Sequence, residues 1–261
     1  MLFEKVITKR ASRWSAMLFS ASLALSGCAD VDGETSELGD DDVLAQEAQA
    51  DLGMGNGRDV VTIGDSWMSN SLFTGNALEG ALDRLQPLHS YRHYARQGVL
   101  LLEDNLLFGP AIPKQWNDAV RQNPNIKTVI MTAGGNDVLQ DPGAQADCQR
   151  GGAKCKATLK TIGAALGALW QKMGEAGVKD VIYIGYSENA GKAGPDAANA
   201  TKNGVSEICA AASNIRCHLI ESTPHIAKRD LISDGIHPNQ AANDRLAKVI
   251  VDLMKAEGIR R

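Results

Sequence analysis

The stretch VTIGDSWMSN, residues 61–70, decides how the domain is arranged. Val61, Thr62 and Ile63 are apolar or β-branched and predict a short buried strand, and Gly64 marks a tight turn directly after it. Polar residues follow, so the strand ends by presenting Ser66. The question that this stretch raises is whether that serine performs chemistry.

Short apolar runs alternate with amphipathic stretches from Arg58 onward. Strands are predicted over five ranges: Asp59–Ile63, Ser90–Ala95, Lys127–Ala133, Asp180–Tyr186 and Arg216–Glu221. Apolar residues recur at helical spacing between Cys155 and Gly177, and again after Pro238. Strands such as TVIMTAG and DVIYIG are apolar almost throughout, as in parallel sheets covered on both faces. We therefore predict an α/β fold for residues 58–261: a three-layer α/β/α sandwich with a five-stranded, mainly parallel sheet.

Residues 1–27 have the pattern of an export signal. Lys5, Lys9, Arg10 and Arg13 precede a short run of apolar and small residues, which is too short to span a bilayer. The run ends in Leu25-Ser26-Gly27-Cys28, which resembles the lipobox of bacterial lipoproteins. That resemblance implies a protein exported and anchored to the cell envelope, facing the periplasm or the surface, by lipid on Cys28. Plain secretion with a free Cys28, or a cytosolic N-terminal helix, are the alternatives.

Residues 28–57 contain nine acidic residues and no Lys or Arg. Such a segment has too little apolar surface to fold, and we interpret it as an acidic disordered tether. Removing these nine negative charges and the net +3 of residues 1–27 from the overall −4 leaves a domain near +2. The basic residues are scattered, so nothing in the charge pattern indicates a nucleic-acid partner.

Four cysteines remain after Cys28: Cys148, Cys155, Cys209 and Cys217. An even number in an exported protein suggests two disulfides, and four cysteines allow three pairings. We favour the short-range pairing, Cys148 with Cys155 and Cys209 with Cys217, in which each bond closes a loop of under ten residues and contributes roughly 2–3 kcal/mol. A zinc site is the competing interpretation, but neither spacing is CxxC.

Three short motifs lie at predicted strand ends or in loops, and a separate glycine, Gly98, follows the second strand. The motifs are Gly64-Asp65-Ser66, Gly134-Gly135-Asn136-Asp137 and Asp234-Gly235-Ile236-His237. Each motif alone is most often an ordinary turn. Their shared location matters because ligands bind beyond the carboxyl ends of parallel strands.

In their order and spacing, these motifs resemble those of the SGNH/GDSL hydrolase superfamily. The resemblance covers nearly the whole domain and implies a flavodoxin-like fold and a serine esterase or lipase that needs no cofactor or metal. It implies that Ser66 is the nucleophile, His237 its base and Asp234 the carboxylate that orients the histidine. It also implies an oxyanion hole formed by the backbone N–H groups of Ser66 and Gly98 and the side-chain amide of Asn136. Trp67 departs from the pattern, since the family name expects leucine there.

The chemistry of ester cleavage explains why such a set of residues is needed. A serine hydroxyl is a poor nucleophile until a base removes its proton, and the resulting imidazolium needs a carboxylate behind it. Asp234 and His237 are also possible metal ligands, but the sequence places no third one. We expect Asp65 and Asp137 to hydrogen-bond their own turns. Among the other histidines, His225 is a weaker candidate to line the site, and three are expected to pack: His89, His93 and His218.

The expected activity is carboxylic ester hydrolysis through an acyl-enzyme. Two alternatives remain: acyl transfer at the same site to a sugar or lipid acceptor, and a catalytically silent surface lipoprotein that binds glycans. The segment Leu139–Lys156 follows the Asn136 motif, is polar and glycine-rich, and is expected to rim the site. This composition favours small or polar acyl esters, such as acetylated carbohydrates, over long-chain lipids.

Overall fold

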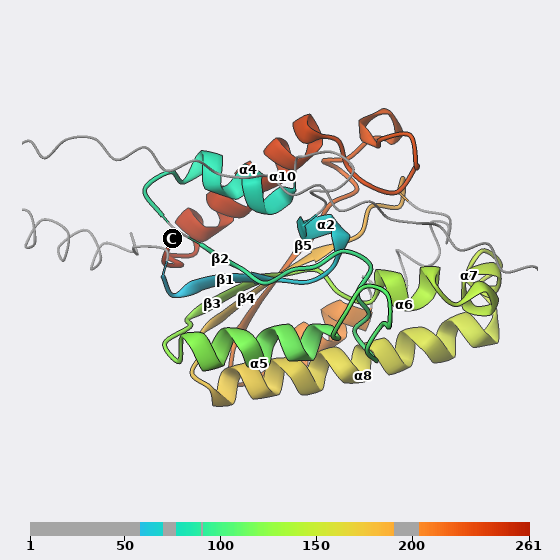
Figure 1. Ribbon diagram of the computed structural model, residues 1–261, viewed down its shortest axis with the longest axis horizontal. Coiled ribbons are helices and arrows are strands. Elements are labelled where there is room, and N and C mark those ends of the chain that lie inside the picture. Colours follow the sequence, from blue (N-terminus) through green and yellow to red (C-terminus); the bar gives the residue numbers. More distant parts are fainter. Residues whose placement is uncertain (1–57, 70–76, 90, 191–203) are drawn as a thin grey trace, which may run out of the picture. The chain divides into compact units, whose positions relative to one another are not determined.

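The computed structural model describes residues 58–69, 77–89, 91–190 and 204–261 (Figure 1). The predicted signal, Cys28 and the acidic tether lie outside the described residues. In the part of the chain that is described, no helix combines the length and the apolar character needed to cross a membrane.

Five parallel strands form one sheet in the order β2-β1-β3-β4-β5. They are β1 (Val60–Ile63), β2 (Arg92–His93), β3 (Thr128–Met131), β4 (Asp180–Gly185) and β5 (Arg216–Glu221). This order is that of flavodoxin-like sheets, so the predicted fold is confirmed, with every strand pair parallel. The edge strand β2 is shorter than its predicted range Ser90–Ala95. After β2, backbone hydrogen bonds still connect the chain to β1 and to the glycine that follows it. The N–H of Tyr94 donates to the carbonyl of Thr62, and the N–H of Arg96 donates to the carbonyl of Gly64.

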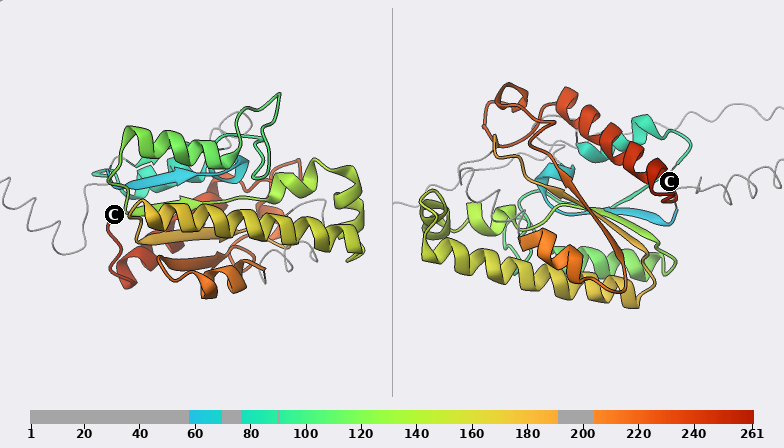
Figure 2. Two further views of the ribbon diagram at one scale, coloured as in Figure 1. Left: turned by 90° about the horizontal axis from the view of Figure 1, so that it is seen from below. Right: turned by 180° about the vertical axis from the view of Figure 1, so that it is seen from behind.

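Helices cover both faces of the sheet. Those that pack on it are α4 (Leu78–Leu85), α5 (Ile112–Gln122), α8 (Ala153–Glu175) and α10 (Gln240–Ala256). Figure 1 shows α4 and α10 on one face and α5 and α8 on the other, and the turned views of Figure 2 show the same layers. Shorter helices lie at the carboxyl ends of the strands: α2 (Ser66–Ser69), α6 (Gly135–Leu139), α7 (Pro142–Cys148) and the 3-10 turn η1 (Lys228–Asp230).

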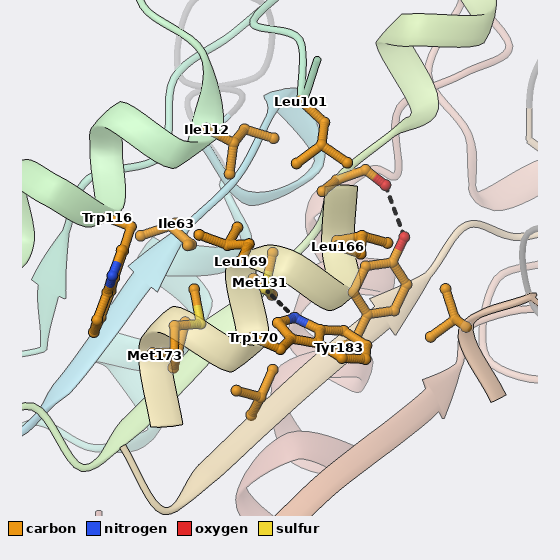
Figure 3. Close-up of a cluster of buried hydrophobic side chains, with 14 of the residues drawn as sticks. Ile63, Leu101, Ile112, Trp116, Met131, Leu166, Leu169, Trp170, Met173 and Tyr183 are labelled. Carbon is orange, nitrogen blue, oxygen red and sulfur yellow. Dashed lines mark hydrogen bonds between the residues drawn. The ribbon is translucent and has the colours of Figure 1, made fainter. Parts of the chain in front are cut away.

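The core has two parts because successive side chains of a strand point to opposite faces. In β3, Val129 and Met131 pack toward α5 and α8, whereas Ile130 packs toward α4 and α10. Figure 3 shows the first part, where the indole N–H of Trp170 donates to Met131 Sδ at 3.3 Å and Tyr183 donates to the carbonyl of Ala133 at 2.7 Å. Both polar tips are therefore satisfied inside an apolar layer.

Two disulfides are present, and both are the short-range ones that were favoured. Cys148–Cys155 joins the end of α7 to the first turn of α8. Cys209–Cys217 fixes the segment before β5 to that strand. The first bond therefore closes the polar insertion that follows the Asn136 motif.

Buried polar groups join α4 to the first two strands. Thr62 in β1 donates to Glu79 Oε1 at 2.5 Å and contacts His93 Nδ1 at 2.9 Å. His93 in turn bonds Asp83 through Nε2 at 3.0 Å. Burial raises the pKa of Glu79 from 4.5 to about 7, and the contacts with His93 and Thr62 oppose that rise.

This shift predicts a pH-dependent stability. Because the folded-state pKa of Glu79 is raised, the contribution of its carboxyl to the free energy of unfolding is largest below pH 4.5. We expect that contribution to decrease by about 3 kcal/mol in total as the pH rises to about 7. In Glu79→Gln, the free energy of unfolding, measured by urea titration, should decrease much less between pH 4.5 and about 7 than it does in the wild type. Glu175→Gln should show the same decrease as the wild type. An unchanged pH dependence in Glu79→Gln would contradict the assignment.

Candidate active site

The turn that carries Ser66 is shaped by contacts from distant segments. Gly64 has φ +138°, and a Cβ there would lie 2.6 Å from the carbonyl oxygen of Thr132, so glycine is required. The buried amide of Gln115 in α5 holds this glycine on both sides, accepting from its N–H at 2.7 Å and donating to its carbonyl at 3.0 Å. Ser66 therefore begins α2 at a fixed place just beyond the end of β1.

Ser66, His237 and Asp234 form a connected triad. His237 Nε2 lies 2.7 Å from Ser66 Oγ, and His237 Nδ1 lies 2.6 Å from Asp234 Oδ2. The side chain of His237 is 13% exposed. The imidazole thus lies between a hydroxyl and a carboxylate, at the distances that proton transfer requires.

Asp234 also organises the loop that bears the histidine. Its Oδ1 accepts from the N–H groups of Ile236 at 2.8 Å and His237 at 3.0 Å. Partial burial alone would raise the pKa of Asp234, but the hydrogen bonds from His237 and Ile236 outweigh it and lower the pKa below 3.8. The carboxylate therefore stays ionised at neutral pH, as support of a protonated imidazole requires.

Further hydrogen bonds close the 230–239 loop. The N–H of Ile232 donates to the carbonyl of His237 at 2.9 Å, and the N–H of Asn239 donates to the carbonyl of Asp230 at 2.7 Å. Arg245 of α10 pairs with Asp230 at 2.6 Å. Because the loop is tied to itself and to α10, the histidine is held in place relative to the sheet.

Gly98 and Asn136 lie beside each other. The Asn136 amide donates to the carbonyl of Val99 at 3.0 Å, which leaves its second N–H hydrogen for another acceptor. Gly98 has φ +68°, and a Cβ there would lie 2.3 Å from the ring of Phe108. Among the described residues, the N–H groups of Ser66 and Gly98 donate no hydrogen bond. Each of the three predicted oxyanion donors therefore has an N–H hydrogen that could bond to a ligand.

Asp137 of α6 and Gln140, which caps the end of this helix, hold Gly98 and the segment that follows it. Asp137 accepts from the N–H groups of Leu101 at 2.9 Å and Leu102 at 3.0 Å, so its contacts extend beyond its own turn. Gln140 donates to the carbonyl of Gly98 at 2.7 Å. The helix that carries Asn136 therefore also fixes the backbone that carries Gly98.

Asp65 and Tyr186 connect the serine turn to the Asn136 turn. Asp65 accepts from the N–H of Trp67 at 3.1 Å, as expected for its own turn, and also from Thr132 at 2.9 Å and from the hydroxyl of Tyr186. The same hydroxyl accepts from the N–H of Gly135 at 3.2 Å. Burial raises the pKa of Asp65 above 3.8 despite these hydrogen bonds. Tyr186 was not among the sequence candidates, although it directly follows β4 at the same sheet edge.

Trp67 is 4% exposed and packs edge-on against Tyr186, with ring centroids 5.2 Å apart. It lies beneath the serine turn in the core on the α4 and α10 side. The carbonyl of His225 accepts from Arg245, and among the described residues no hydrogen bond joins the His225 side chain to the triad. His218 bonds Asp180 at 3.0 Å, away from the serine turn.

In the described part of the chain, no three His, Cys, Asp or Glu side chains are grouped so that they could hold a metal ion. The polar segment after α6 lines a groove of about 550 Å³, together with the start of α8. Polar lining residues include Gln140, Asp141, Lys154, Thr158 and Thr161.

No protein-family model matches the chain, and no curated protein matches its sequence. Solved structures do match. An acetylxylan esterase from Geobacillus stearothermophilus, solved as a catalytic mutant, aligns with TM-score 0.55 and 15% identity over 80% of this chain and 99% of its own. An α/β hydrolase from the Lake Arreo metagenome aligns with TM-score 0.55 and 17% identity over 78% and 97%. A GDSL-like lipase from Bacteroides thetaiotaomicron aligns with TM-score 0.51 and 16% identity over 83% and 97%. The chain thus shares its α/β fold with these solved hydrolases.

Proposed function

We propose that this protein is a serine-dependent carboxylic ester hydrolase that works through an acyl-enzyme intermediate. The observation that carries the proposal is the continuous hydrogen-bond chain from Ser66 through His237 to Asp234. The similarity of the fold to esterases and a GDSL-like lipase supports the same reaction class.

In the proposed reaction, Ser66 Oγ attacks the ester carbonyl while His237 Nε2 takes its proton. The resulting oxyanion accepts hydrogen bonds from the N–H groups of Ser66 and Gly98 and from the Asn136 amide. The C–O bond to the alcohol then breaks as His237 returns the proton to the leaving oxygen. Water, activated by the same histidine, attacks the acyl-enzyme and releases the acid. These steps use no cofactor or metal.

We propose small or polar acyl esters, such as acetylated carbohydrates, as substrates. The groove beside α6 supports this class because amide, hydroxyl and charged side chains that can hydrogen-bond a sugar lie in its lining, beside Leu100, Leu102 and Ala157. A fluorophosphonate probe provides the direct test of the reaction class, with labelling at Ser66 detected by peptide mass spectrometry. The absence of labelling in a folded protein would favour a silent binding protein. Ester products formed with added alcohols would favour acyl transfer.

Export and lipid anchoring through Cys28 remain part of the proposal. Two disulfides in the domain support an oxidising compartment. The mature N-terminal peptide should carry a lipid mass on Cys28, and Cys28→Ser should move the protein from the membrane to the soluble fraction. A mature chain that starts upstream of Cys28 would overturn this part.

Replacing Asn136 by alanine should lower kcat by about 10²–10³-fold, because one oxyanion donor is lost. The comparison variant is Asn214→Ala, which removes a similar amide hydrogen bond, to the carbonyl of Gln171 at 3.2 Å, in an exposed place. Steady-state kinetics on p-nitrophenyl acetate measures both. Equal activity of the two variants would remove Asn136 from the oxyanion hole.

We expect Tyr186→Phe to lower kcat by about tenfold with little change in KM, because the serine and Asn136 turns lose their shared hydroxyl. Tyr183→Phe is the matched control, since it also removes a buried tyrosine hydroxyl, the donor to Ala133. Both variants should lose about 1 kcal/mol of stability. A fall in kcat of equal size in both would show that the effect is only structural.

A further inference from the structure

The loop between β2 and α5 displays large apolar side chains to solvent. Leu106 is 102% exposed and Leu107 is 88% exposed, and Leu102 and Phe108 are also exposed. In the left view of Figure 2, this part of the green chain extends away from the helices. Apolar residues gathered in this way on a surface commonly mark a place where a ligand binds.

Hydrogen bonds hold the loop in this shape. Asn105 and Gly109 pair through their backbones at 2.9 and 2.8 Å. The side chain of Asn105 accepts from the N–H groups of Leu107 at 2.9 Å and Phe108 at 3.2 Å. Asp104 accepts from the N–H of Ala111 at 2.9 Å and pairs with Lys114. The leucines are thus presented by a structured turn.

The loop is also connected to the oxyanion segment. The Phe108 ring fills the space that a side chain at position 98 would need, which explains the glycine there. Asn105 donates to Gln140 at 2.6 Å, and Gln140 donates to the carbonyl of Gly98 at 2.7 Å. The apolar wall and the Gly98 N–H therefore belong to one hydrogen-bonded unit.

A groove of about 440 Å³ lies along this wall. Leu107 and Phe108 line one part of it, and Gln97, the neighbour of Gly98, lines another. Gln97 also donates to the carbonyl of Ser69, one helical turn after the nucleophile, at 3.3 Å. The remaining lining residues are Ser69, Ala77, Glu79, Ala95 and Arg96, so the groove combines an apolar wall with polar and charged groups. The groove thus extends from Leu107 and Phe108 to Ser69 and Gln97, which lie close in sequence to Ser66 and Gly98.

We propose that this groove binds an alkyl or aryl group of the ester substrate, with Leu107 and Phe108 as its wall. The inference rests on the proposed esterase function and adds an apolar specificity element to it. An ester has two sides that can carry such a group, the acyl side and the alcohol side. A second groove, whose lining includes Leu100 and Leu102 together with polar residues such as Gln140 and Thr158, lies next to the Gly98–Leu102 segment.

Two substrate series that share ethyl acetate test the proposal. One lengthens the acyl side through ethyl butyrate to ethyl hexanoate, and the other lengthens the alcohol side through butyl acetate to hexyl acetate. All are used below the concentration at which they aggregate, and acid release is followed by titration. The variant is Leu107→Ser. Its controls are Leu88→Ser, which changes an equally exposed leucine (89%) elsewhere, and Leu106→Ser, which changes the neighbouring leucine outside the groove.

In one series, we expect Leu107→Ser to reduce kcat/KM about tenfold for the six-carbon member and less than twofold for ethyl acetate, because a longer chain covers more of the leucine. That series identifies the side of the ester that enters the groove. The proposal would be overturned if Leu107→Ser left the dependence of kcat/KM on chain length unchanged in both series. It would also be overturned if Leu106→Ser reduced kcat/KM as much as Leu107→Ser, which would indicate contact with an aggregated lipid surface. Failure of the esterase function itself looks different: the wild type would hydrolyse no ester, and Ser66 would not be labelled.

Discussion

Ser66→Ala should reduce the turnover of p-nitrophenyl acetate by at least about 10⁴-fold. The hydroxyl oxygen that forms the acyl bond is removed, and no other described hydroxyl contacts His237 Nε2. The remaining oxyanion donors would keep only the acceleration that comes from binding and charge stabilisation.

The serine variant needs a check on folding, because Ser66 lies where several segments meet. We expect its thermal unfolding midpoint to change little, since the lost hydrogen bond joins two partly exposed groups. Ser213→Ala, at an exposed serine before β5, should keep full activity. Substantial turnover in a folded Ser66→Ala protein would exclude the acyl-enzyme mechanism.

Asp234→Asn should reduce kcat by about 10³–10⁴-fold. Asparagine can still accept from the N–H groups of Ile236 and His237 through its Oδ1, so the loop keeps its shape. Its amide nitrogen would then face His237 Nδ1 and donate to it. That contact favours the tautomer with the proton on Nε2, which cannot accept the proton of Ser66.

Asp252→Asn is the matched control, since it neutralises an exposed aspartate of α10 that pairs with Lys248. Kinetics over a range of pH should show reduced kcat for Asp234→Asn at every value, because the ionised carboxylate of the wild type is already present well below neutral pH. Loss of activity only at low pH would contradict the orienting role.

The sequence predicted the sheet well because parallel strands covered on both faces must be apolar almost throughout. The range of β5 was predicted residue for residue, and β4 within one residue. The rule that ligands bind beyond the strand ends then placed Ser66 and Asn136 at one edge. The roles of Asp234 and His237 came from the resemblance to the SGNH/GDSL hydrolases, and their spacing agrees with it, because three residues suffice for a carboxylate to reach the imidazole across a turn.

The groups that fix the site were harder to find. Gln115 lies in the first turn of α5, and only the packing of that helix reveals that its amide faces Gly64. Tyr186 could have been proposed from the sequence, because it directly follows an apolar strand at the edge where ligands bind. The rim was only partly predicted: the polar segment Leu139–Lys156 was expected there, whereas no role was predicted for the exposed Leu106 and Leu107. Their exposure depends on the turn set by Asn105, which sequence periodicity does not report.

The partners of the Gly64–Ser66 turn have a consequence for the order of folding. Gln115, Thr132, Tyr186 and His237 come from segments 51 to 171 residues away in the chain. A peptide containing only β1 and α2 therefore lacks the partners that shape the turn at Ser66. Because contacts between distant segments form late, we expect the turn to take its final form only after α5 has docked and β3, β4 and the last loop have joined the sheet, so the geometry around Ser66 is completed last.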